Sequence, residues 1–286
     1  MTADNHSEAV VAHYTPVDLL GRVELALREA GLADRLLAPD DLGPVDEFHI
    51  GGAPATMSLA EHLDLGPSSH VVDLGSGLGG PARRVAAAYG CRVTGIDLTP
   101  AYVEVAAALT RRSGLGDRVQ FCTGSVLDLP FEDHAFDAAM QLHVGMNLPD
   151  KARSFAEIAR VVRPGGVVGI YDVVWRDGGR LEFPVPWAST PGQSHVGTVE
   201  EYVEGLEAAG FDVEMRDQSA RAVATLRAMA ERAGKPGPLG LRLVLGSTAA
   251  VKLKNLGRAV SYGVLGPVEF VARRPPADPD AAQARP

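Results

Sequence analysis

The first segment whose residue types suggest chemistry is DLGSGLGG, at residues 73–80. Gly75, Gly77 and Gly80 fit the GxGxxG pattern of dinucleotide-binding loops, in which glycines allow a tight turn and let a ligand approach backbone N–H groups. Asp73 argues against a dinucleotide, because a pyrophosphate gains nothing from a neighbouring carboxylate, whereas a ligand with an ammonium group does. The loop therefore predicts a binding site in which a cationic group is favoured over a pyrophosphate.

A second acid and a second loop follow the next two apolar runs of the chain, as the glycine loop follows the first. Asp97 ends the apolar run at 91–96, where an acid commonly accepts hydrogen bonds from both hydroxyls of a ribose. The loop GSVLDLPF at 124–131 follows the next apolar run and is placed to reach an adenine ring. Taken singly, Asp73 and Asp97 could be turn-capping residues. Together with the glycines between them, they predict a site for an adenosine-containing ligand.

These residues need a sheet that brings the ends of their strands together, and the chain has the pattern of one. Seven short apolar runs read as strands, at 70–74, 91–96, 118–122, 136–141, 167–174, 211–216 and 264–272. Helical patterns lie between them, at 81–89, 101–113, 150–162 and 198–209. This alternation predicts βαβ units in an α/β fold with a mainly parallel sheet. The residues RPGG at 163–166 predict a turn that ends a helix, and the carboxyl ends of the strands predict the ligand crevice.

The rest of the chain predicts helices around this sheet. The N-terminal part favours one helix over 9–31 and a short helix at 55–64, joined by a looser stretch that contains prolines. We expect helices between the last two strands to cover the ligand edge. The chain is thus divided into a helical cap at 1–64, a single sheet domain at 65–273 with a helical insertion at 218–260, and a disordered tail at 274–286.

Composition narrows the classes of function. The 286 residues are 46% hydrophobic and 22% charged, as in ordinary globular proteins. A formal net charge of −9 gives no general attraction for nucleic acid or anionic membranes. The two cysteines, Cys91 and Cys122, cannot form a disulfide framework or a four-thiolate metal site, so no metal is expected. The absence of a recognisable targeting signal and of a long apolar run predicts a cytoplasmic protein, whose oligomeric state stays open.

The run from Val71 to Val174 resembles the class I S-adenosylmethionine-dependent methyltransferases. VVDLGSGLGG resembles the family's first motif, GIDLTP its second, GSVLDLPF its adenine loop, and RVVRPGGVVGIYDVV the segment through its fifth strand. HIGG, HVGMNLPDKA and FPVPWA are similar to the small-molecule branch, with its sarcosine/dimethylglycine-like and ubiquinone/tocopherol-like enzymes. The resemblance implies a Rossmann-like, seven-stranded methyltransferase sheet and S-adenosyl-L-methionine as cofactor.

The resemblance also implies roles at the methionine end of that cofactor. Gly75 and Gly77, with Ser76 between them, would approach the methionine part. Asp73 would lie near its amino group. Gln141, after the fourth strand, would bind its carboxylate, although an exposed amide at a strand end is the alternative.

At the adenosine end, Asp97 would hold the ribose and Leu98 would pack on the adenine. Ser125 and Val126 would belong to the adenine loop. The family usually has an acid at the position of Ser125, and a hydroxyl without charge makes a weaker contact with the adenine amino group.

His143 also follows the fourth strand and is the candidate general base, because a histidine ordinarily titrates near neutrality. A hydrogen-bonded structural histidine is the alternative. Tyr14 could pack on the sulfonium by cation–π attraction. Five further residues are expected to close over the cofactor or to shape the acceptor pocket: His49, Met146, Tyr171, Trp187 and His195. Each of them could equally serve packing alone.

Two functions fit these patterns. The first is methyl transfer to a small-molecule acceptor, which needs mainly alignment and desolvation because a sulfonium is already a reactive electrophile. The second is a cyclase or isomerase that keeps the methyltransferase fold and the cofactor without transferring a methyl group. A nicotinamide oxidoreductase is a weaker third reading of the glycine loop.

Overall fold

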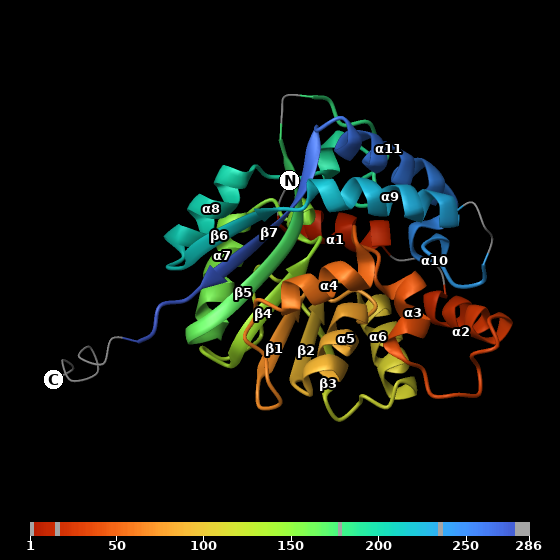
Figure 1. The fold of residues 1–286 in the computed structure, drawn as a ribbon, viewed down its shortest axis with the longest axis horizontal. Coiled ribbons are helices and arrows are strands. Elements are labelled where there is room, and N and C mark those ends of the chain that lie inside the picture. The colour runs from red at the N-terminus through yellow and green to blue at the C-terminus, as the bar shows by residue number, and fades with distance from the viewer. Residues whose placement is uncertain (1–2, 15–17, 177–178, 234–236, 278–286) are drawn as a thin grey trace.

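The sheet has the predicted strands in one continuous layer. The structure is a computed structural model that describes residues 3–14, 18–176, 179–233 and 237–277. Its strands are β1 (His70–Leu74), β2 (Arg92–Asp97), β3 (Val119–Thr123), β4 (Phe136–Leu142), β5 (Val162–Trp175), β6 (Asp212–Asp217) and β7 (Leu265–Arg273). They form one seven-stranded sheet in the order β3-β2-β1-β4-β5-β7-β6 (Figure 1). Strands β1 to β5 are parallel and β7 is antiparallel to both neighbours, which confirms the α/β Rossmann-like prediction.

Helices cover both faces of this sheet, which explains why its strands read as continuous apolar runs. Val71 packs into a cluster with α4 (Gly52–Ala60) and α5 (Gly80–Tyr89). Its neighbour Val72 points to the opposite face, into a cluster with α7 (Lys151–Val161) and α8 (Val199–Ala208). Both valines are fully buried. Helix α6 (Pro100–Arg112) completes the crossover between β2 and β3.

The N-terminal cap differs from the prediction. Two helices, α1 (Ala3–Tyr14) and α2 (Leu19–Glu29), replace the single helix expected over 9–31. Asp18 caps α2, since its side chain accepts from the Gly21 N–H at 3.2 Å. Its φ of 51° is left-handed, so the chain turns at this residue and a continuous helix is impossible.

The stretch expected to be loose contains a further helix, α3 (Pro39–Asp46). Pro39 starts it, as the fixed φ of proline allows in a first turn. The Asp41 carboxylate accepts from the Ala38 N–H at 2.8 Å. Leu42 and Val45 of this helix are buried, so Pro39 marks a helix start rather than a loop, and Pro44 lies inside the helix.

The predicted turn at 163–166 is part of β5. Gly165 has a φ of +76° and its N–H bonds to the Arg274 carbonyl at 3.1 Å, while the register between β4 and β5 shifts between Phe136 and Ala138. An irregularity of this kind lets a strand continue through a glycine pair. The backbone contact also ties down Arg274, at the start of the predicted tail, whereas 278–286 lie outside the described residues.

The insertion before β7 is helical, as expected. It contains α9 (Ser219–Ala233), α10 (Arg242–Leu245) and α11 (Ala249–Ser261), which gather at the same end of the molecule as α1 (Figure 1). Single 3-10 turns occur at Gly145–Asn147, Pro191–Gln193 and Gly246–Thr248. In the part of the chain that the structure describes, each helix is too short or too polar to cross a bilayer.

Candidate functional site

A pocket lies at the carboxyl ends of β1 to β4, beneath α1. Most of the residues singled out in the sequence line it: Tyr14, His49, Gly75, Ser76, Gly77, Asp97, Leu98, Ser125, Val126, His143, Met146 and Trp187. Four others do not: Asp73, Gln141, Tyr171 and His195. The fold thus brings together segments of the chain that are more than one hundred and seventy positions apart, from Tyr14 to Trp187.

The glycine loop after β1 needs glycine both for its backbone and for its neighbours. Gly75 and Gly77 have φ values of +69° and +52°, which favour glycine. A Cβ on Gly75 would collide with the Val144 side chain, and one on Gly77 would lie 2.9 Å from Phe48 Cζ. The space at these glycines is therefore already occupied by protein side chains that line the same pocket.

Asp97 fixes this loop from the end of β2. Its Oδ2 accepts from the Gly77 N–H and its Oδ1 from the Thr99 N–H, both at 2.8 Å. Burial raises the pKa of the carboxyl, and the two backbone N–H groups counter that shift. Each carboxylate oxygen has more than one lone pair, so Asp97 can still accept from ligand hydroxyls while it holds the loop.

Asp73 is buried directly beneath the loop, with 1% of its surface exposed. Its Oδ2 has no hydrogen-bond partner. Burial, together with the negative charges of Asp97 and Glu47, raises the pKa of this carboxyl to about 8. The Ser76 hydroxyl nearby lines the pocket and is also unpartnered. Buried polar atoms usually have partners, so the Ser76 hydroxyl in the lining is suited to meet a polar ligand, whereas Asp73 lies behind the lining.

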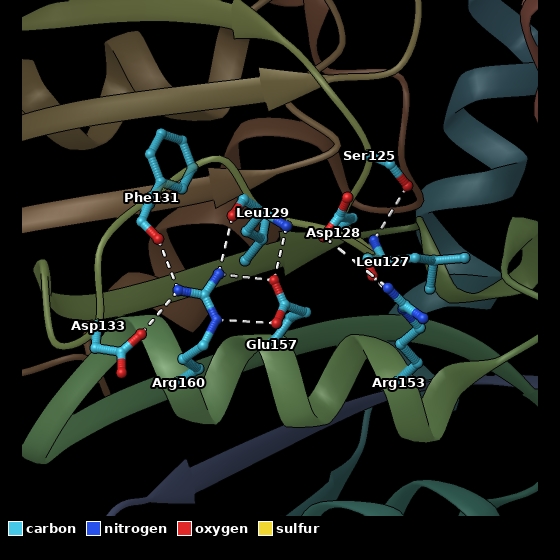
Figure 2. A network of polar contacts seen from close by, with 9 residues as sticks. All are labelled: Ser125, Leu127, Asp128, Leu129, Phe131, Asp133, Arg153, Glu157 and Arg160. Carbon is cyan, nitrogen blue, oxygen red and sulfur yellow. Dashed lines mark hydrogen bonds and ion pairs between the residues drawn. The ribbon is translucent and has the colours of Figure 1, made fainter.

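The loop at 124–131 is held in place by α7 (Figure 2). Glu157 accepts from the Leu129 N–H at 2.7 Å, and Arg160 donates to the Leu129 carbonyl at 2.9 Å. The Ser125 hydroxyl accepts from the Leu127 N–H at 3.1 Å and thereby stabilises the turn itself. A hydroxyl suits this turn, which gives Ser125 a local structural role in addition to its place in the pocket lining.

His143 stands at the start of the loop after β4 in a left-handed conformation, with a φ of +56°. Non-glycine residues rarely adopt this conformation, and such strain of about 1–2 kcal/mol is often found at functional sites. Its N–H donates to the Tyr171 carbonyl at 2.7 Å, and its ring lies 5.2 Å from that of Tyr171 and 6.0 Å from that of His49, between centroids. Its Nε2 is buried without a partner.

The environment of His143 corrects the expectation of a pKa near neutrality. Burial, and then the neighbouring His49, lower the pKa of the imidazole well below its ordinary value. The ring is therefore neutral throughout the physiological range. A neutral imidazole at the pocket wall can accept a proton, so the residue retains the chemistry of a base without titrating near pH 7.

A buried clamp, which the sequence did not predict, holds the loop that carries His143. One oxygen of Asp172, Oδ2, accepts from the Gly145 N–H at 2.9 Å, from Tyr202 at 3.0 Å and from Gln141 Nε2 at 3.1 Å. A Cβ on Gly145 would collide with the Tyr202 hydroxyl. No local signal links Tyr202, in an ordinary amphipathic helix, to a loop so far away in the sequence.

This clamp also changes the role expected of Gln141. The side chain is fully buried, lies outside the pocket lining and directs its amide nitrogen to Asp172. Its Oε1 has no hydrogen-bond partner. Gln141 thus supports the loop in this structure, and its binding of the cofactor's carboxylate stays a prediction.

Several acceptor-side residues have structural partners of their own. The Tyr14 hydroxyl donates to Asn147 at 3.3 Å, which docks α1 on the loop after β4. His49 Nε2 lies 3.1 Å from the Gly52 carbonyl, and burial lowers the pKa of this imidazole. Trp187 Nε1 donates to Ser194 at 2.9 Å. These contacts hold in place rings that line the pocket. Tyr14, His49 and Trp187 therefore contribute both to packing and to the shape of the pocket.

Tyr171 and His195, which were expected to shape the acceptor pocket, lie behind the pocket lining and are not part of it. Tyr171 is 2% exposed and packs beneath the His143 and His49 rings. His195 joins the loop after β4 through its backbone, since its N–H donates to the Met146 carbonyl at 2.8 Å. The lining residues that sequence reasoning missed include Val10, Phe48, Tyr102 and Leu245. Apolar and aromatic residues carry no local signal that separates a pocket wall from a core.

Comparison with known proteins agrees with this geometry. Residues 72–170 match the family model of a methyltransferase domain. Methyltransferase GfsG of Streptomyces halstedii is 33% identical over 186 residues, which cover 63% of this chain and 66% of that protein. Sterol 24-C-methyltransferase ERG6B of Gibberella zeae is 34% identical over 119 residues, 42% of this chain and 31% of that protein. The matched part thus spans under two thirds of either relative.

Among solved structures, the [4+2]-cyclase SpnF superposes with a TM-score of 0.69 and 26% sequence identity, covering 95% of this chain and 97% of that one. The glycine loop, the acid that ends β2 and the matched family model define a class I S-adenosylmethionine-dependent methyltransferase domain. Within that family, the chain is similar to enzymes of the small-molecule branch.

Proposed function

We propose that this protein transfers the methyl group of S-adenosylmethionine to a small-molecule acceptor. The observation that carries the proposal is the glycine loop, held by Asp97 through the Gly77 N–H above the buried, unpartnered oxygen of Asp73. An ammonium group near Asp73 and ribose hydroxyls on Asp97 would satisfy these atoms. The residues present therefore fit the cofactor that the family uses.

The chain's own residues would position the cofactor and the acceptor and would remove a proton from the acceptor. They would not need to activate the methyl group. The cofactor supplies a methyl group on a sulfonium, which is already electrophilic. Asp97 would orient the ribose, and Tyr14 and Trp187 would exclude water from the reacting groups. His143, with its neutral ring and unpartnered Nε2, would accept the proton that the acceptor loses. Asp172 would keep the His143 loop in place through Gly145.

Calorimetric titration of the full chain with S-adenosylhomocysteine tests the cofactor assignment. We expect binding by the parent protein and at least tenfold weaker binding by Asp97→Ala, which removes charge-assisted acceptors of about 1.5–3 kcal/mol each. Release of S-adenosylhomocysteine from S-adenosylmethionine with an acceptor panel then tests the reaction. Unchanged affinity in a folded Asp97→Ala protein would refute the assignment.

Similarity to the cyclase SpnF over nearly the whole chain favours a second candidate, cyclisation or isomerisation within the same pocket. The two functions differ in one product, because methyl transfer forms one S-adenosylhomocysteine for each acceptor consumed and cyclisation forms none. We also propose 65–273 as the catalytic domain, with 1–64 and 218–260 as its cover, since Val10 and Leu245 line the pocket. A cytoplasmic location and the exclusion of nucleic acid as acceptor stay predictions from the sequence.

A further inference from the structure

The pocket has charged side chains of only one sign in its wall. Asp46 and Asp97 line it, and the Asp46 carboxylate is paired with the buried Arg83. Over the described ranges of the chain, its lining includes neither lysine nor arginine. The lining therefore offers no free cation to an anionic acceptor, whereas the Asp97 carboxylate suits a cationic methyl donor.

Two cations near the pocket, Arg83 and Lys151, are already engaged. Arg83 is completely buried and donates to Asp46 at 2.5 Å and to the Leu78 carbonyl at 2.7 Å. Lys151 donates to the carbonyls of Leu148 and His195, at 3.1 and 2.5 Å. Turning either side chain toward a ligand would leave buried acceptors without partners, which is costly. Neither is placed to neutralise an anion in the pocket.

Much of the remaining pocket wall is apolar and carries no positive charge. It includes Val10, Val144, Met146, Leu148, Pro186 and Trp187, beside the polar Ser7 and Asn147. The two histidines in this wall, His49 and His143, have pKa values lowered by burial and are neutral near pH 7. A phosphate or carboxylate placed here would lose its water and meet no cation, which costs several kcal/mol.

An amine acceptor is also disfavoured. The Asp97 carboxylate in the wall favours the protonated form of an amine, and an ammonium group has no lone pair with which to attack a methyl group. A hydroxyl group has both a lone pair and a proton. That proton matches the unpartnered Nε2 of His143 in the wall.

We propose that the acceptor is an uncharged, largely apolar molecule that is methylated on a hydroxyl oxygen, and that molecules bearing phosphate, sulfate or carboxylate are excluded. This inference rests on the proposed methyl transfer. The hydroxyl proton passes to Nε2 of His143 as the oxygen lone pair forms the new bond to the methyl carbon. The carbon–sulfur bond breaks with its electron pair left on sulfur, and the imidazolium then releases its proton to water.

The test uses the full-length protein saturated with S-adenosylhomocysteine and a library of matched series. Each series contains an apolar alcohol or phenol, its phosphate ester and the amine with the same carbon skeleton. Calorimetry should show alcohols bound at least about tenfold more tightly than their phosphate esters. With S-adenosylmethionine in place of S-adenosylhomocysteine, alcohols that bind should be methylated and the matched amines should not. Phosphate esters bound as tightly as the alcohols, amines methylated as fast as the alcohols, or a library in which no alcohol binds would each overturn the proposal.

A gain-of-function variant sharpens the result. Val10→Arg places a guanidinium in the pocket wall and should tighten binding of the phosphate esters about tenfold or more. Leu25→Arg, on an α2 position that is 52% exposed, is the matched control and should change nothing. Equal effects of the two variants would mean that general charge decides, which contradicts the proposal. Failure to bind S-adenosylhomocysteine at all would instead overturn the proposed function itself.

Discussion

Asp73 should make cofactor affinity depend on pH. Its carboxyl has a pKa of about 8 because it is buried beside other carboxylates, so it is protonated in the free protein at neutral pH. A ligand ammonium group favours the ionised form, and binding below pH 8 must therefore expel a proton. Each pH unit below 8 costs about 1.4 kcal/mol, so affinity should fall about tenfold per unit and about 100-fold from pH 8 to pH 6.

The assay is calorimetric titration with S-adenosylhomocysteine at pH 6, 7 and 8, in two buffers that differ in ionisation enthalpy. Near pH 7 about one proton should be released for each molecule bound. Asp73→Asn is the matched variant, since it keeps the shape and removes the titration; its affinity should be weaker at pH 8 and independent of pH. Equal parental affinities at pH 6 and pH 8 without proton release, or an unchanged slope in the variant, would refute the reasoning.

The raised pKa of Asp73 also determines how the stability of the folded protein changes with pH. The folded-state pKa of Asp73 lies above that of the unfolded chain, so ionisation favours unfolding. The cofactor-free protein should therefore lose stability as the pH rises toward 8, and Asp73→Asn should lose less over that range. Chemical denaturation at pH 6 and pH 8 measures both.

Other substitutions test the remaining parts of the site. Gly77→Val should lower both the melting temperature and S-adenosylhomocysteine affinity, because its side chain meets Phe48 at a positive φ; a variant with parental values of both would contradict this. His143→Ala should lower turnover about 10²–10⁴-fold with little change in cofactor affinity. Turnover in the parent should show no step from His143 between pH 6 and 8, since the pKa of its imidazole lies well below 6.5; a step that disappears in His143→Ala would count against this. Asp172→Asn, which weakens the clamp on Gly145, should lower turnover more than it raises the Michaelis constant of the acceptor, and the opposite pattern would assign Asp172 to acceptor binding.

The sheet and the cofactor half of the site could be predicted from the sequence because their signals are local. Continuous apolar runs mark strands buried on both faces, and Val71 and Val72 do point to opposite layers. Gly75 and Gly77 adopt the positive φ values that a tight loop requires. Asp97 lies beside that loop because parallel neighbouring strands end at the same edge.

The remainder depends on contacts between distant segments. Nothing near Tyr202 in the sequence indicates that its hydroxyl meets Asp172, or that Gln141 donates to the same carboxylate. Burial likewise determines the pKa of His143, which the residue type alone does not reveal. In the cap, Asp18 turns the chain through a left-handed conformation inside an otherwise helical pattern.

The strand order has a consequence for how the chain folds during synthesis. Strand β7 lies between β5 and β6, and within the described chain β6 pairs with β7 alone. When β6 leaves the ribosome it has no partner, and the exposed edge of β5 stays open until some fifty further residues have followed. The first five strands can assemble meanwhile as a parallel unit. The half of the molecule that carries the glycine loop is thus ready to form early, whereas the far edge of the sheet must wait, open to incorrect pairing, for the last strand to enter between two others.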